Sequence, residues 1–114
     1  MIKSTYDVIV VGAGPGGSTA ALEAASKGMN VLLLERKPEI AIPVRCAEGV
    51  SQHGLKTYYE PEPRWIAAEI DGVKLVAPNG QTVLVEDGQK GYILRRDVFD
   101  EKKKKKAEQA GAEI

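Results

Sequence analysis

The sequence predicts an α/β fold in which parallel strands alternate with helices and an antiparallel β-meander is inserted. A run at 6–11 is apolar and β-branched on both faces, so we expect a central strand that is covered on both sides. It is followed by a glycine-rich turn, a helical pattern and a second apolar run at 31–34. Alternating strands and helices are typical of α/β proteins with a parallel sheet. From Trp65 the hydrophobic period changes to two, which indicates an antiparallel part, and at 96–111 it returns to that of a helix.

Length and composition limit the chain to one domain at most. It has 114 residues, of which 43% are hydrophobic, and its sixteen basic residues balance sixteen acidic ones. A chain without net charge gives no general reason to expect nucleic acid as a partner. The single cysteine, Cys46, excludes an internal disulfide and a cysteine-only metal site, and His53 has no partner at metal-ligand spacing. We therefore predict no metal site, and we expect a cytoplasmic protein without a membrane span.

A glycine-rich turn joins the first strand to the first helix. In this turn Gly12 permits a sharp bend, Gly14 lets the backbone approach a diphosphate, and Gly17 lets the helix pack closely on the strand. Pro15 suits the first turn of the helix, where its missing N–H has no partner in any case. The free N–H groups and partial positive charge of the helix N-terminus stabilise an anion. The turn therefore predicts a phosphate-binding loop.

The residues after this turn complete a dinucleotide-binding unit. Gly28 ends the helix, and a second parallel strand follows at 31–34. Glu35 then lies 23 positions after Gly12, where a carboxylate accepts hydrogen bonds from the adenosine ribose. Its negative charge argues against NADP, whose 2′-phosphate it would repel. Residues 1–37 are thus predicted to form a Rossmann-like βαβ unit.

Residues 38–64 are predicted to form a loop at the carboxyl edge of the sheet, where ligands bind in such folds. The segment has no hydrophobic period and carries several prolines, although one or two helical turns are expected over 51–59. Its middle concentrates chemically active side chains between small residues, namely Arg45, Cys46 and Glu48.

Residues 65–95 are predicted to form the antiparallel β-meander. Asp71-Gly72 and Asn79-Gly80 are hairpin signals, because both residues of each pair tolerate positive φ. They separate short stretches with a period of two, at 66–70, 73–77, 82–86 and 92–95.

Residues 96–114 return to a helix, capped by Gly111, and then begin a further strand at 112–114. If Phe99 faces the core, three of the five other positions on its face are lysines, at 102, 103 and 106. Such a stripe is a packing defect. Two parallel strands are also too few to bury both faces of a nucleotide-binding sheet, so we interpret the chain as a fragment that lacks a substrate domain.

Several stretches together resemble the geranylgeranyl reductase family of flavoproteins, especially the archaeal digeranylgeranylglycerophospholipid reductases. They lie at 6–28, 31–35, 43–49 (Pro-Val-Arg-Cys-Ala-Glu-Gly) and 91–100. The resemblance implies a p-hydroxybenzoate-hydroxylase-like fold and a longer parent chain. Residues 1–114 would then be the N-terminal part of its FAD-binding domain.

The resemblance also implies which residues bind FAD. The glycine-rich loop would cradle the diphosphate, Glu35 with Arg36 beside it would bind the ribose, and Arg96 would contact FAD from the end of the meander. Residues of the 43–49 stretch would line the flavin. Arg45 is either an arginine that orients a flavin or lipid phosphate through its planar fork or a surface arginine. The full set is Gly12, Gly14, Pro15, Gly16, Gly17, Glu35, Arg36, Arg45, Cys46, Ala47, Gly49 and Arg96.

Three features allow two interpretations each. Cys46 is either a redox-sensitive thiol near the flavin, and so a catalytic residue, or a small buried apolar side chain. Glu48 is either a proton donor or a solvated carboxylate. The lysine run at 102–106 either attracts anionic lipid headgroups or forms a solvated helix face.

The resemblance implies an FAD-dependent reductase of CH–CH groups that saturates isolated C=C bonds in the isoprenoid chains of membrane lipids. Its partners would be a prenylated lipid and an external electron donor, either NAD(P)H or of the ferredoxin type, with peripheral contact to the cytoplasmic membrane face. Two alternatives stay open: a flavin monooxygenase or halogenase, and a non-catalytic nucleotide-binding module. The isolated 114 residues are expected to be inactive.

Overall fold

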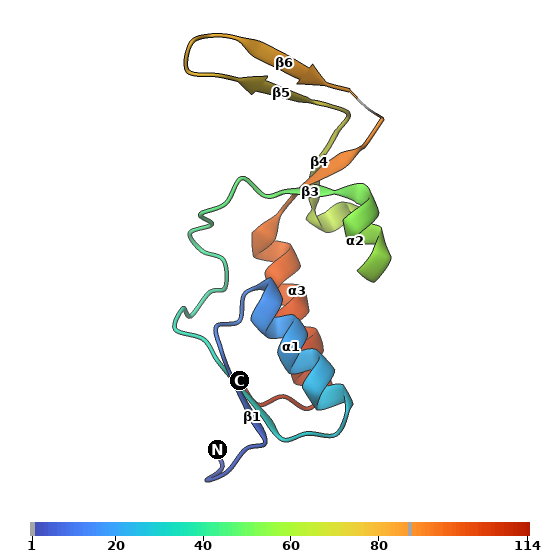
Figure 1. The fold of residues 1–114 in the computed structure, drawn as a ribbon. Helices are drawn as coiled ribbons and strands as arrows, with labels where there is room; N and C mark the ends of the chain where they lie inside the picture. The colour runs from blue at the N-terminus through green and yellow to red at the C-terminus, as the bar shows by residue number, and fades with distance from the viewer. Residues whose placement is uncertain (1, 87) are drawn as a thin grey trace. The chain divides into compact units, whose positions relative to one another are not determined.

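The computed structural model describes residues 2–86 and 88–114 and divides the chain into two compact units. One unit contains Met1–Arg45 together with Arg96–Ile114, and the other contains Cys46–Arg95 (Figure 1). Parallel strands with helices form the first unit, and antiparallel strands dominate the second. The predicted α/β class is therefore confirmed.

The first unit is a βαβ arrangement that a later helix joins. Its elements are β1 (Val8–Val11), α1 (Pro15–Ser26), β2 (Val31–Leu34) and α3 (Arg96–Gln109). β1 and β2 are parallel, with Val8 opposite Val31. The further strand expected at 112–114 begins as predicted, because Glu113 forms a parallel bridge with Leu32 and its carbonyl accepts the N–H of Leu33 at 2.8 Å. β2 is thus flanked on both sides.

Small side chains let the two helices and the sheet approach closely. Ala21 and Ala25 of α1 join Ala107 of α3 and the inward-facing Val31 and Leu33 in one buried cluster. Figure 1 shows α1 and α3 side by side, and the two helices pack against each other. This packing sets the position of the start of α1, where the glycine-rich loop ends.

Only one face of β1 is covered, which corrects a prediction. We expected β1 to be buried on both faces, as strands of parallel sheets are. Instead Ile9 and Val11 are 58% and 82% exposed, whereas Val8 and Val10 pack against the core. The reason is that α1 and α3 contribute to the same cluster, on the side of Val8 and Val10.

The second unit contains two antiparallel sheets. Its elements are β3 (Gly49–Ser51), α2 (Gln52–Tyr58), a 3₁₀ turn (Pro63–Trp65), β4 (Ile66–Ile70), β5 (Val73–Val76), β6 (Thr82–Val85) and β7 (Gly91–Leu94). One sheet has the order β3-β7-β4, and β5 with β6 forms a separate hairpin. The four antiparallel strands predicted between Trp65 and Arg95 are therefore present.

Their pairing differs from that of a simple meander. β4 pairs with β7 rather than with β5, so Asp71 and Gly72 connect two sheets instead of forming a hairpin turn. The Asn79-Gly80 turn does close a hairpin: Gly80 has a φ of 85°, and the N–H of Ala77 donates to the carbonyl of Gln81 at 2.8 Å. A dipeptide signal thus predicts a turn but not which strands it joins.

The strand β3 lies in a segment that we predicted as a loop. Val50 pairs with Tyr92 of β7, and the hydroxyl of Ser51 accepts the N–H of Gly54 at 3.0 Å to begin α2. A strand of three residues that starts with glycine is too short to show a hydrophobic period. The buried side chains of this unit, Leu55, Trp65, Tyr92 and Leu94, do belong to periodic segments or their flanks.

Candidate cofactor-binding site

The glycine-rich loop has the geometry that a phosphate-binding turn requires. Gly12 has a φ of 98°, in the left-handed region, and its N–H donates to the carbonyl of Leu34 at 2.7 Å. A Cβ at Gly17 would lie 1.8 Å from the Gly12 carbonyl oxygen, so only glycine fits this contact. A Cβ at Gly14 or Gly16 would meet no atom within 4 Å. The positive φ of Gly12 and the close contact at Gly17 shape the turn. The missing side chains of Gly14 and Gly16 leave space beside it.

The N-terminus of α1 is open to an anion. The helix begins at Pro15 with Gly14 as its N-cap, it has no side-chain cap, and its first turn carries no acidic residue. Its unsatisfied N–H groups and partial positive charge therefore favour a negatively charged ligand. This arrangement fits the diphosphate of a dinucleotide.

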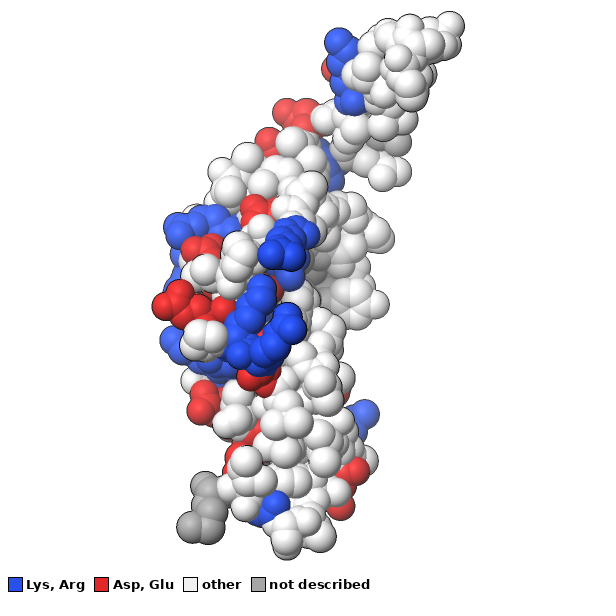
Figure 2. Space-filling view, turned by 90° about the vertical axis from the view of Figure 1, so that its left-hand side faces the viewer, with Lys and Arg blue, Asp and Glu red and all other residues white. Residues whose placement is uncertain are grey.

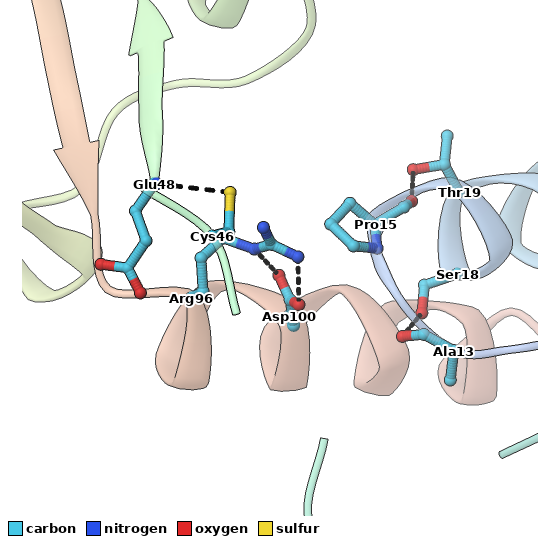
Figure 3. Close-up of polar contacts among 8 residues, drawn as sticks. All are labelled: Ala13, Pro15, Ser18, Thr19, Cys46, Glu48, Arg96 and Asp100. Atoms are coloured by element: carbon cyan, nitrogen blue, oxygen red, sulfur yellow. Dashed lines mark hydrogen bonds and ion pairs between the residues drawn. The ribbon is translucent and has the colours of Figure 1, made fainter. Parts of the chain in front are cut away.

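Two hydroxyl groups that the sequence reasoning missed brace this loop. The buried Ser18 donates from Oγ to the carbonyl of Ala13 at 2.8 Å, and Thr19 donates from Oγ1 to the carbonyl of Pro15 at 2.6 Å (Figure 3). The bond from Ser18 ties the loop to the first turn of α1, and the bond from Thr19 lies within that turn. A hydroxyl directly after Gly17 was the available signal, because serine and threonine often bond to nearby backbone groups.

Glu35 connects the ends of both strands. Its Oε2 accepts the N–H of Ala13 at 2.8 Å, and its Oε1 accepts the N–H of Lys37 at 2.8 Å. These two bonds, that from Lys37 first, hold the pKa of Glu35 below its ordinary value. An ionised carboxylate has about four acceptor positions, so the two backbone bonds are compatible with further bonds to ribose hydroxyls. Glu35 is therefore both oriented and charged.

Arg96 belongs to the same unit as the glycine-rich loop, and its guanidinium is held by a buried acid. Nε of Arg96 donates to Oδ1 of Asp100 at 2.7 Å, and Nη2 donates to Oδ2 at 2.8 Å (Figure 3). Asp100 is 1% exposed. The exposed Arg36 and Arg45 also lie in this unit, at the surface. The unit thus contains the predicted diphosphate and ribose residues together with three arginines.

The predicted flavin-side residues Cys46, Ala47 and Gly49 belong to the second unit. Cys46 is exposed, and its Sγ accepts the N–H of Glu48 at 3.3 Å. The interpretation of Cys46 as a buried apolar side chain is therefore wrong, because the thiol lies at the surface of this unit. Glu48 has a φ of 64°, which is uncommon for a residue with a side chain.

The described part of the chain has neither a metal-binding cluster nor a membrane-spanning helix. Within residues 2–86 and 88–114 there is no group of three or more His, Cys, Asp and Glu side chains that could hold a metal ion. No helix in the same ranges is long and apolar enough to cross a membrane.

Comparison with known proteins identifies the class of cofactor-binding site to which the glycine-rich loop and Glu35 belong. The model of a family described as FAD dependent oxidoreductase matches residues 7–40, which span the glycine-rich loop and Glu35. The predicted cofactor, FAD, is therefore confirmed. The halogenase PltM has a similar fold, with a TM-score of 0.70 over 95% of this chain at 18% identity.

More similar proteins define the family. Digeranylgeranylglycerophospholipid reductases of Methanothermobacter thermautotrophicus and Methanocella arvoryzae are 52% and 49% identical over 100% and 99% of this chain. A geranylgeranyl bacteriochlorophyll reductase-like protein of Thermoplasma acidophilum is 40% identical over 96% of the chain, with a TM-score of 0.84. Over nearly its whole length the chain is therefore similar to members of the geranylgeranyl reductase family of flavoproteins. It spans about 30% of the length of these two curated relatives and 29% of the solved protein.

Proposed function

We propose that this chain is the FAD-binding part of a reductase that saturates isolated C=C bonds in the geranylgeranyl chains of membrane lipids. The observation that carries the proposal is the loop from Gly12 to Gly17 followed by the oriented carboxylate of Glu35, in a chain about half identical to reductases named for such lipids. When bound, reduced FAD supplies the hydride that such a reduction needs.

This chain's own residues bind and orient the cofactor. The N-terminus of α1 would hold the diphosphate, and Glu35 would hold the ribose with its remaining acceptor positions. Cys46, Ala47 and Gly49 would line the flavin, and Arg45 would orient a flavin or lipid phosphate. The substrate would be a prenylated lipid, and an external donor would reload the flavin. Peripheral contact with the cytoplasmic membrane face would bring the enzyme to its substrate.

Two glycines allow a sharp test of the cofactor site. Gly14 has a φ of −64° and open space at its Cβ, so Gly14→Val should leave the fold intact and fill the space beside the diphosphate. Gly17→Ala should instead damage the fold, because its Cβ would collide with the Gly12 carbonyl. FAD titration and thermal melts of the full-length apoprotein separate these effects.

The proposal expects Gly14→Val to keep the wild-type melting temperature and to lose at least roughly tenfold in FAD affinity. Wild-type affinity in this variant would contradict the placement of the diphosphate. A full-length wild-type protein that shows no flavin band after reconstitution with FAD would refute the proposed function itself. Turnover by the isolated 114 residues would show that the remaining chain is not needed.

A further inference from the structure

We propose that Asp100 is a positioning residue of the FAD site and that it acts through Arg96. The inference rests on the proposed function, because it takes Arg96 to contact FAD. Asp100 is absent from the predicted binding set, yet the structure buries it almost completely, at 1% exposure. A buried carboxylate needs a partner. The partner of Asp100 is Arg96, the first residue of α3.

Asp100 fixes the plane of the guanidinium as well as its position. The two bonds, at 2.7 and 2.8 Å, are parallel and join the Nε–Nη2 edge of Arg96 to both carboxylate oxygens. Such paired, charge-assisted bonds give geometric specificity that a single contact lacks. The side chain of Arg96 is 21% exposed and that of Asp100 is 2% exposed. The arginine is thus accessible to a ligand, and the acid behind it is not.

The guanidinium lies on the side of α3 that faces α1. Figure 3 shows the side chains of Arg96 and Asp100 and the start of α1 at Pro15 on the same side of α3. The two helices pack against each other in the first unit. A diphosphate at the N-terminus of α1 would therefore have an oriented cation on its side of α3, and a guanidinium suits phosphate because of its planar set of donors.

Helix stability does not explain the pair. Arg96 is the first residue of α3, where a cation opposes the helix dipole. An acid four residues after a base is the less favourable order for such a pair within a helix. Burial of the carboxylate also costs solvation free energy that the ion pair only roughly offsets. An arrangement that is unfavourable in these three respects points to a role in placing Arg96.

The test is a double-mutant cycle in the full-length apoprotein, with the FAD dissociation constant measured from quenching of flavin fluorescence. Asp100→Asn keeps the shape but removes the charge, and we expect it to weaken FAD binding roughly tenfold. Arg96→Ala should weaken binding at least as much. Asp100→Asn should then cause no further loss when Arg96 is already alanine. A merely structural role would lower affinity equally in both backgrounds.

The matched control is Glu101→Gln in the next position of α3. Glu101 pairs with Lys104 at 3.1 Å and with Lys105 at 4.0 Å on the more exposed side of the helix. This variant also removes a carboxylate from an ion pair in the same helix, and it should leave FAD affinity unchanged.

Three outcomes would overturn the inference: wild-type affinity in Asp100→Asn, wild-type affinity in Arg96→Ala, or fully additive losses in the double variant. If Asp100→Asn melts far below wild type, Arg96→Lys decides, because lysine keeps the charge without the planar fork. If Arg96→Lys loses as much FAD affinity as Arg96→Ala does, the inference is supported. Wild-type FAD affinity in Arg96→Lys contradicts it. Failure of the wild-type protein to bind FAD would refute the proposed function instead.

Discussion

Glu35 does more than the sequence reasoning assigned to it. Its spacing from Gly12 predicted a ribose ligand, but the structure also shows it holding the backbone after β1 and after β2 through Ala13 and Lys37. The carboxylate therefore orders the binding loop before any ligand arrives. Preorganisation of this kind reduces the entropy that ligand binding must cost.

Substitution of Glu35 should therefore affect both the loop and the ligand. In Glu35→Gln one of the two backbone N–H groups faces an amide NH₂ instead of an oxygen, and the ribose loses a charge-assisted acceptor. We expect a loss of about 1 to 2 kcal/mol in FAD binding, roughly tenfold in affinity. FAD titration of the full-length apoprotein measures it. Glu39→Gln, an exposed neighbour, is the control; equal affinities of the two variants would remove Glu35 from the site.

The lowered pKa of Glu35 also predicts a pH dependence. Because the folded pKa lies below the unfolded one, the contribution of Glu35 to stability is present above the unfolded pKa of about 4.3. It is lost as the pH falls through the lowered folded pKa. Denaturant melts of wild type and Glu35→Gln should therefore differ constantly above about pH 5.5 and converge in more acidic buffer. A difference that grows on acidification would contradict the bonds from Ala13 and Lys37.

At the scale of elements, α3 shows where a periodicity argument succeeds and where it fails. The pattern predicted lysines 102, 103 and 106 on the face of Phe99. The structure buries Lys103, at 3% exposure, together with Phe99 and Ala107, but it leaves Lys106 exposed. Lys102 is intermediate, and burial followed by the like charge of Lys106 lowers its pKa. The face of α3 that packs on the core is therefore narrower than expected. The prediction that Lys106 lies on this face is wrong.

Because Lys103 is buried and Lys106 is exposed, replacing each with leucine should affect stability differently. Lys103→Leu changes a buried side chain and should shift the free energy of unfolding by about 1 kcal/mol or more, which corresponds to a few degrees in melting temperature. Lys106→Leu places an apolar side chain in solvent and should leave the melting temperature unchanged. Thermal melts of the full-length variants measure both. A larger shift in melting temperature from Lys106→Leu than from Lys103→Leu would show that the burial pattern of α3 is wrong.

The same variants test whether the lysines bind membranes. Figure 2 shows basic side chains interspersed with acidic ones on the face in view, and such mixed charges attract an anionic surface only weakly. We therefore expect Lys103→Leu and Lys106→Leu to sediment with anionic vesicles as wild type does. Loss of binding in Lys106→Leu without any change in melting would instead establish a lipid-binding face on α3.

At the scale of the whole molecule, local sequence patterns predicted the helices and strands better than they predicted which segments contact one another. The βαβ unit followed from glycine spacing and from Glu35, since each feature lies within one short segment. The pairing of β4 with β7 was not predictable, because it depends on contacts between segments more than twenty residues apart. Asp100 was missed for the same kind of reason: an acid inside a charged helix shows no sign in the sequence that it will be buried.

Some strands of this chain carry apolar side chains that are exposed in the structure. The chain spans about 30% of the length of the curated relatives described above, and Ile9 and Val11 of β1 are exposed in the structure. The hairpin of β5 and β6 likewise exposes Leu75, Val83 and Leu84 by more than half. Large exposed apolar patches commonly mark interaction surfaces or ligand-binding grooves.

The most direct test of the central claim is mass spectrometry of the lipid product. The full-length protein, reconstituted with FAD and supplied with a chemical reductant, is incubated with a geranylgeranylated glycerophospholipid. The account predicts that the lipid gains two hydrogen atoms for each C=C bond that is reduced, and that Gly14→Val loses this activity together with its flavin band. Insertion of oxygen or halogen into the lipid, or an unchanged lipid with a fully flavinylated, reduced enzyme, would contradict it.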